Sequence, residues 1–130
     1  MQSNPMNTIE NPPASASSSH KNPCYDSDST TATLGVFIDA ISYTLPYAHF
    51  LYAERRPNPA LENEPEAPPE EMRLHFVSAE VVICGSGLRM LERAIQKYEL
   101  KSVKAADRRL AGSLATHVAS ITHTLTKEYL

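Results

Sequence analysis

The stretch of sequence that decides the fold spans residues 72–98 and reads MRLHFVSAEVVICGSGLRMLERAIQKY. An apolar, strand-like run occupies its first half and ends at Gly85-Ser86-Gly87. A helical pattern opens directly afterwards, because apolar residues recur at the spacing that places them on one helix face; they are Leu88, Leu91, Ile95 and Tyr98. The stretch therefore predicts a strand region, a glycine-rich turn and a helix over about residues 87–98.

The strand region changes phase near Ser78-Ala79-Glu80. Two strands joined by a turn, or one strand with a bulge, would both account for the change. From Val81 to Cys84 the residues are apolar on both faces, which is typical of a central strand covered on both sides.

Three further strand-like runs lie upstream. Val36 to Ile38 is a short apolar run, and Ile41 to Leu45 alternates with the period of two that a half-buried strand requires. Pro46 cannot donate to a strand ladder, so it marks an edge, a bend or a break. Residues 47–53 alternate again and are rich in aromatic residues, which favours another strand.

Downstream of the helix, residues 100–110 fit either a short strand or a loose helix, and Val118 to Leu125 has the composition of a final strand. Strand runs and helix are segregated along the chain, which is typical of the α+β class. We therefore expect a small, mostly antiparallel sheet of four or five strands, with one main helix at about residues 87–98 packed on one face.

The chain has 130 residues, enough for one domain. Residues 1–32 are rich in Pro, Ser, Thr and Asn and poor in large apolar residues, so we expect a disordered leader. Residues 33–130 are then expected to form a single small α+β domain. Because a core of that size is marginal, we also expect dimerisation that buries further surface.

An acidic, proline-rich loop is expected at residues 57–71, which hold five prolines and five glutamates. Prolines stiffen such a segment and exclude a strand. Loops of this length in small domains are usually functional or disordered. A solvated insertion is the simpler interpretation of the two.

The compartment is inferred from the lack of a signal pattern or membrane span and from the small number of cysteines. The chain shows no secretory signal pattern and no apolar run long enough to span a membrane. Its two cysteines, Cys24 and Cys84, fall one in the expected leader and one in the expected domain, which fits a reducing compartment. These features predict a cytoplasmic protein without membrane contact.

Gly85-Ser86-Gly87 suggests two roles at the start of the helix. Backbone N–H groups there could cradle a phosphate or carboxylate. Met90 and the sequence after Gly87 break the dinucleotide and phosphate-loop patterns, however. We therefore expect a purely structural turn in which Ser86 caps the helix.

Cys84 precedes the helix and is the one candidate nucleophile. It would need a histidine base, and no sequence spacing selects one, so a small apolar core residue is the favoured interpretation. His117 and His123 lie six positions apart without a cysteine partner, which does not match a zinc site. The sequence predicts no metal and no cofactor.

A basic stripe recurs every four residues along the expected helix and continues beyond it, at Arg89, Arg93, Lys97 and Lys101. It predicts an anionic partner, either nucleic acid or an acidic protein segment. The overall balance is acidic, with net charge −3 and a pI near 5.9, which argues against nucleic acid. The acidic loop at 57–71 is a complementary segment, in the same chain or in a second copy.

An aromatic platform is expected in the strand region that holds Tyr43, Tyr47, Phe50 and Tyr52. Tyrosine suits interfaces because one end of its ring is apolar and the other wet. The structural alternative is a core strand followed by an edge strand. If exposed, these residues favour a protein interface, including edge pairing between two copies, over a base-stacking surface.

Taken together, these patterns predict a small non-catalytic protein-interaction or accessory module that self-associates as a homodimer. The second hypothesis is a nucleic-acid-associated accessory protein that uses the basic stripe. The third is a thiol enzyme that uses Cys84.

Overall fold

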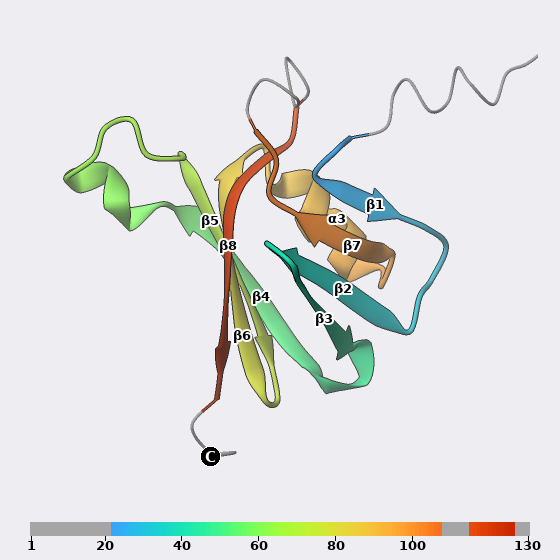
Figure 1. Cartoon of the computed structure of the whole chain (residues 1–130). Helices are drawn as coiled ribbons and strands as arrows, with labels where there is room; N and C mark the ends of the chain where they lie inside the picture. The colour runs from blue at the N-terminus through green and yellow to red at the C-terminus, as the bar shows by residue number, and fades with distance from the viewer. Residues whose placement is uncertain (1–21, 108–114, 127–130) are drawn as a thin grey trace, which may run out of the picture.

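The computed structural model describes residues 22–107 and 115–126 (Figure 1). This part of the chain holds eight strands, two short 3-10 helices and one α-helix. In chain order they are β1 (Tyr25–Ser27), β2 (Thr33–Ile38), β3 (Ile41–Pro46), η1 (Tyr47–His49), β4 (Phe50–Pro57), η2 (Pro59–Glu62), β5 (Glu70–Phe76), β6 (Ala79–Ser86), α3 (Arg89–Gln96), β7 (Leu100–Lys104) and β8 (His117–Leu125).

The strands form two four-stranded sheets, in the orders β1-β7-β2-β3 and β4-β5-β6-β8. All neighbouring strands are antiparallel except β2 and β7, which are parallel. The predicted α+β class and mostly antiparallel pairing are confirmed. The predicted single sheet is wrong, because the chain leaves the first sheet at Pro46, makes the turn η1 and begins the second sheet at Phe50.

Two tight hairpins settle choices that the sequence left open. β5 and β6 are joined through Val77 and Ser78, so the phase change in that region is a turn between two strands and not a bulge within one. β2 and β3 are joined at Asp39, whose φ of 54° supplies the left-handed backbone that such turns need without a glycine. Residues 100–104 are a strand, β7.

The folded part of the chain begins before the predicted boundary at residue 33. β1 pairs with β7, and the side chain of Cys24 is fully buried. The Val118 N–H donates to Cys24 Sγ at 3.2 Å, and Asn22 Nδ2 donates to the Thr116 carbonyl at 2.8 Å. Residues 22–32 therefore belong to the domain, and residues 1–21 of the expected leader lie outside the described residues.

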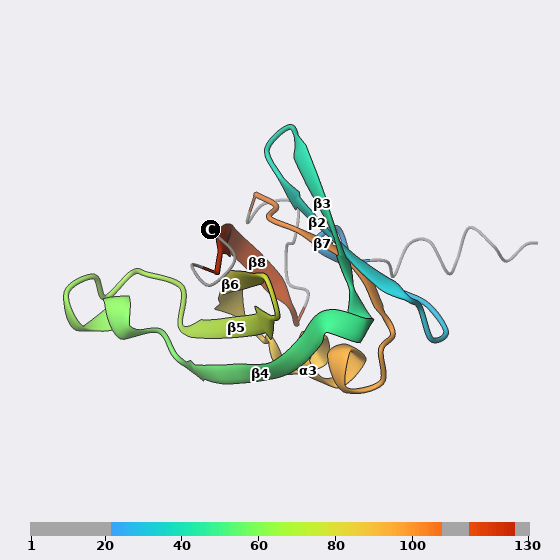
Figure 2. The same ribbon diagram turned by 90° about the horizontal axis from the view of Figure 1, so that it is seen from below.

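The core lies between the two sheets, and α3 packs against β4 of one sheet and β7 of the other (Figure 2). Leu88, Leu91 and Ile95 are buried as the helical pattern predicts. Tyr98 is not, because α3 ends at Gln96 and Tyr98 takes a positive φ of 57°, which leaves its ring 46% exposed beside Tyr47. No helix within residues 22–107 and 115–126 is long and apolar enough to cross a membrane.

Candidate interaction surfaces

The outer face of the sheet β4-β5-β6-β8 is built by strand alternation. Along β5, Met72, Leu74 and Phe76 are buried in the core. The residues that alternate with them are Glu71, Arg73 and His75, and these point outward.

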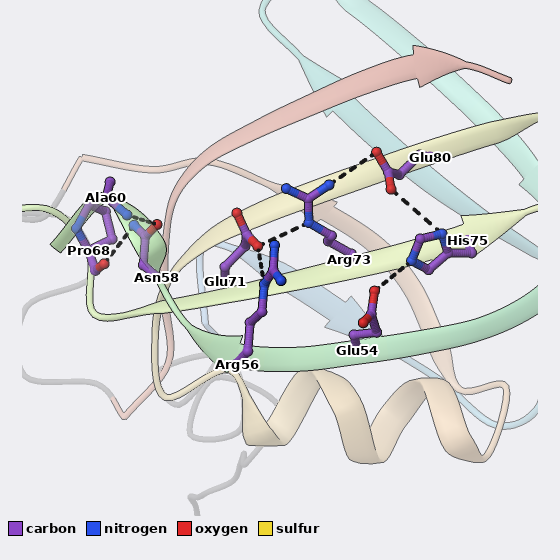
Figure 3. A network of polar contacts seen from close by, with 9 residues as sticks. All are labelled: Glu54, Arg56, Asn58, Ala60, Pro68, Glu71, Arg73, His75 and Glu80. Atoms are coloured by element: carbon purple, nitrogen blue, oxygen red, sulfur yellow. Dashed lines mark hydrogen bonds and ion pairs between the residues drawn. The ribbon is translucent and has the colours of Figure 1, made fainter. Parts of the chain in front are cut away.

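These outward residues belong to a cross-strand network of charged groups on three strands, made of Glu54, Arg56, Glu71, Arg73, His75 and Glu80 (Figure 3). Arg56 Nε and Arg73 Nε both donate to Glu71 Oε1, at 2.8 and 3.0 Å. Arg73 Nη1 reaches Glu80 at 3.3 Å, and the His75 ring lies 2.9 Å from Glu54 and 3.6 Å from Glu80. The network ties β4, β5 and β6 together on the face opposite the core.

Glu71 is the centre of this network and its side chain is nearly fully buried. Burial alone would raise the pKa of its carboxyl, but the hydrogen bonds and charges of Arg73 and Arg56 outweigh that effect and lower the pKa below the ordinary value of 4.5. The carboxylate is therefore held ionised by its two partners.

Replacing Glu71 by glutamine is expected to lower the free energy of unfolding at neutral pH by roughly 1–2 kcal/mol, because the two arginines are partly exposed and solvent screens them. A folded-state pKa below the unfolded one means that this contribution is present above the unfolded pKa and disappears as the pH falls through the folded one. Denaturant unfolding at neutral and acid pH measures both effects. The matched control is Glu99→Gln between α3 and β7; a Glu71→Gln chain that keeps the acid sensitivity of the wild type would contradict the assignment.

The start of α3 is occupied by a carboxylate of the chain itself. Glu70 Oε1 accepts the Leu88 N–H at 2.8 Å, and Arg55 links Glu70 at 3.6 Å to Glu92 at 3.0 Å. The sequence predicts Ser86 or an external anion at this end of the helix; the structure has Glu70 there instead, and Leu88, not Ser86, is the N-cap residue. Glu70 lies 18 positions upstream of Leu88, so only the pairing of β5 with β6 brings it there.

Gly85 and Gly87 have a packing role in this turn. Both pass so close to the backbone of residues 115–118 that a Cβ atom at either position would overlap a carbonyl oxygen. The structural interpretation of the glycines is thus supported by the geometry.

Cys84 points outward from β6, next to Ser120 on β8. Burial raises the pKa of its thiol, although the hydrogen bond with Ser120 opposes the shift. Two of the candidate bases are engaged elsewhere, since His75 contacts Glu54 and Glu80 while His123 stacks on Tyr43. A raised pKa disfavours the thiolate that a nucleophile requires.

Within the described part of the chain, no group of three or more His, Cys, Asp or Glu side chains is placed to hold a metal ion.

The four aromatic residues of the expected platform lie in separate environments. Tyr47 is a core residue whose hydroxyl donates to the Leu100 carbonyl at 2.6 Å, and Phe50 packs edge-on against Phe76, with ring centres 5.3 Å apart. Tyr43 and Tyr52 are more accessible, and each stacks on a histidine of another strand: Tyr43 on His123 at 3.9 Å and Tyr52 on His75 at 4.2 Å. A single platform of all four is therefore wrong, and Tyr47 is excluded from the surface.

A groove of about 600 Å³, lined by both apolar and polar side chains, lies at the β5–β6 turn, and we call it the turn-end groove. Three large apolar side chains on its walls are more than half exposed: Leu51 at 60%, Tyr52 at 52% and Leu125 at 54%. A bulge between Phe50 and Tyr52 adds Leu51 to β4, next to Tyr52 in the chain. A second groove, of about 730 Å³, shares Leu125 and continues past Tyr43.

Sequence reasoning missed Leu51 and Leu125 as surface residues. Both occur in apolar or alternating runs, and nothing in those runs tells which residues the other sheet leaves uncovered. One feature of the sequence could have indicated this: the alternation of side chains is interrupted between Pro46 and Tyr52. The structure has a change of sheet and a bulge in that interval.

The basic stripe is exposed as predicted. Arg89 and Arg93 lie on the solvent side of α3, Lys97 is exposed at its C-terminal cap, and Lys101 lies exposed on β7. None of the ion pairs among the described residues includes these four side chains.

The acidic loop between β4 and β5 is folded. Asn58 is buried. Its side chain donates to the Pro68 carbonyl at 2.8 Å and accepts the Ala60 N–H at 3.1 Å, so it connects the first and last parts of the loop. The loop extends beyond the ends of β4 and β5, away from α3 (Figures 1 and 2). The expected contact within one chain is thus limited to Glu70 at the helix start, and Glu62, Glu64 and Glu66 are exposed.

Comparison of this chain with protein-family models, with curated proteins and with solved structures finds no match.

Proposed function

We propose that this chain is a non-catalytic protein-interaction module that associates with a second copy of itself through the turn-end groove. The observation that carries the proposal is the gathering of Leu51, Tyr52 and Leu125 around one groove, each more than half exposed. Contiguous apolar surface on a small domain marks an interaction site, because leaving it in water is unfavourable.

A second copy is the occupant that the rest of the surface supports. The same chain carries an exposed acidic loop and an exposed basic helix face, so its charges are complementary to those of another copy. The domain is also small, and burying the groove against a second copy adds apolar burial that the monomer lacks. A two-fold axis would let one patch serve both chains.

Replacing Leu51 and Leu125 together by serine is expected to weaken self-association by roughly 100-fold or more, since two apolar anchors are lost from each copy. The measurement is light scattering and analytical ultracentrifugation of the whole chain over a concentration series. Ile41→Ser is the matched control, because Ile41 is 55% exposed but lies at the β2–β3 turn.

Two results would count against the proposal. A wild-type chain that stays monomeric over the whole series would remove self-association. A dimer that survives both leucine replacements, or that is weakened equally by Ile41→Ser, would remove the groove.

Binding of nucleic acid is the second candidate function, and the exposure of Arg89, Arg93 and Lys97 supports it. Phosphate contacts by such residues weaken steeply with added salt. The absorbance of the purified chain at 260 nm tests this directly, because the chain has no tryptophan and bound nucleic acid would dominate the signal.

A further inference from the structure

Several exposed charged side chains take part in none of the ion pairs of the described residues. The pairs use arginines and glutamates on β4, β5 and β6, and Glu92 on α3. Those outside the ion pairs on the acidic loop are Glu62, Glu64 and Glu66, and those on α3 and its C-terminal end are Arg89, Arg93 and Lys97. The two groups are opposite in sign.

The acidic loop presents its charges from a preformed structure. Asn58 connects the two ends of the loop through its hydrogen bond to the Pro68 carbonyl. η2 forms the first turn of the loop, and the Ala67 N–H donates to the Glu64 carbonyl at 2.9 Å. Because this backbone is already ordered, binding costs less conformational entropy than the ordering of a flexible tail would.

The basic face of α3 is suited to receive such a segment. Arg89, Arg93 and Lys97 follow one another at four-residue spacing, so they lie in a row about 12 Å long on one side of the helix. Like charges at this spacing repel one another within the helix, and an acidic partner relieves the repulsion.

The two surfaces of one chain do not meet. The loop points away from α3, and the helix start is filled by Glu70 (Figures 1 and 2). A contact between loop and helix therefore requires two molecules.

We infer that two copies of this chain pair reciprocally, with the acidic loop of each copy lying on the basic face of α3 of the other. The inference rests on the proposed self-association, but it does not depend on the groove. A two-fold axis satisfies both contacts at once, and no charged end is then left over to recruit a third copy.

The test is a charge exchange in the whole chain. One variant carries Arg89→Glu, Arg93→Glu and Lys97→Glu, and a second carries Glu62→Lys, Glu64→Lys and Glu66→Lys. Each alone is expected to weaken self-association by roughly tenfold or more, because every loop–helix contact becomes a like-charge contact. An equimolar mixture of the two variants is expected to form a heterodimer. The chain that carries all six changes is expected to form a homodimer, because its charges are exchanged and complementary again.

The expected results include a dimer that weakens with added salt, since exposed charges are screened. Circular dichroism confirms that each variant is folded. Dimers that are unchanged in both single-surface variants, or a mixture that stays monomeric, would overturn the inference. A basic face that carries nucleic acid in the purified wild type, seen at 260 nm and lost in the variant with glutamates on α3, would overturn it in favour of that partner.

The groove variant separates this inference from the proposed function. If the charge exchange restores pairing while the replacement of Leu51 and Leu125 has no effect, the loop–helix contact holds and the groove is wrong. If the leucine replacement abolishes pairing while the charge variants behave as wild type, the groove holds and the loop–helix contact is wrong. A monomeric wild type overturns both.

Discussion

Replacing Gly87 by alanine is expected to lower the free energy of unfolding by roughly 2–5 kcal/mol, a large fraction of the stability of a domain of this size. Gly87 has a φ of +62°, a conformation that costs an L residue energy even in open space. A Cβ atom there would also lie 1.8 Å from the Ala115 carbonyl oxygen, and that neighbour is backbone, which cannot rotate away. Gly85→Ala is expected to be comparably damaging, since its Cβ would lie 2.0 Å from the His117 carbonyl oxygen.

Gly35→Ala is the control for both changes. Gly35 lies in β2, and a Cβ atom there would meet its nearest neighbour at 3.5 Å, an ordinary contact. Urea unfolding followed by circular dichroism measures all three variants. Equal stability of Gly87→Ala and Gly35→Ala would show that the backbone of residues 115–116 does not lie where the structure places it.

Leu91→Ala is expected to lower the free energy of unfolding by roughly 2–5 kcal/mol, because the side chain is fully buried and its loss leaves a cavity. α3 contacts β4 in one sheet and β7 in the other, so the cavity opens where both sheets meet the helix. Met90→Ala is the matched control: the adjacent side chain is 46% exposed, and its truncation is expected to change stability by about 0.5 kcal/mol or less.

Thermal and urea unfolding of the two variants compare an exposed residue and a buried residue that are neighbours in one helix. If Met90→Ala were the more damaging change, the helix would be rotated relative to the core, and the exposure of Arg89 and Arg93 would need to be reassigned.

Periodicity was sufficient to predict the elements whose neighbours in sequence are also their neighbours in space. The strand, turn and helix of residues 79–96 follow directly from the apolar pattern. β8 was predicted from its composition alone, although its partner β6 lies far upstream in the sequence. The buried face of α3 was predictable because a helix defines its own faces, whatever packs against it.

The two-sheet arrangement was not predictable in the same way. An alternating pattern says which residues point inward, but the same pattern serves one sheet or two, since either gives each strand a buried face. Pro46 was correctly expected to interrupt a strand, yet nothing local indicates that the chain changes sheet there. The bulge after Phe50 then shifts the phase again, which separates Tyr52 from Tyr47 and Phe50.

The candidate surfaces show the same contrast between features set by local sequence and features set by contacts between distant segments. Arg89 and Arg93 of the basic stripe depend only on helix geometry and were predicted from spacing, whereas Lys97 and Lys101 lie beyond the end of α3. The contacts of Glu70 and Glu71 depend on strand register, so the sequence grouped both residues with the loop glutamates although their partners are Leu88, Arg56 and Arg73.

The contacts of Asn22 and Cys24 with Thr116 and Val118 bear on the order in which a newly made chain can fold. The hairpins β2–β3 and β4–β5–β6 join segments that are close in sequence, and such contacts close early. Asn22 and Cys24, by contrast, find their partners Thr116 and Val118 only 94 positions later. Until those residues leave the ribosome, the inner faces of both sheets stay in contact with water. We expect that interval to be the one in which the nascent chain is most prone to aggregate and most dependent on chaperones.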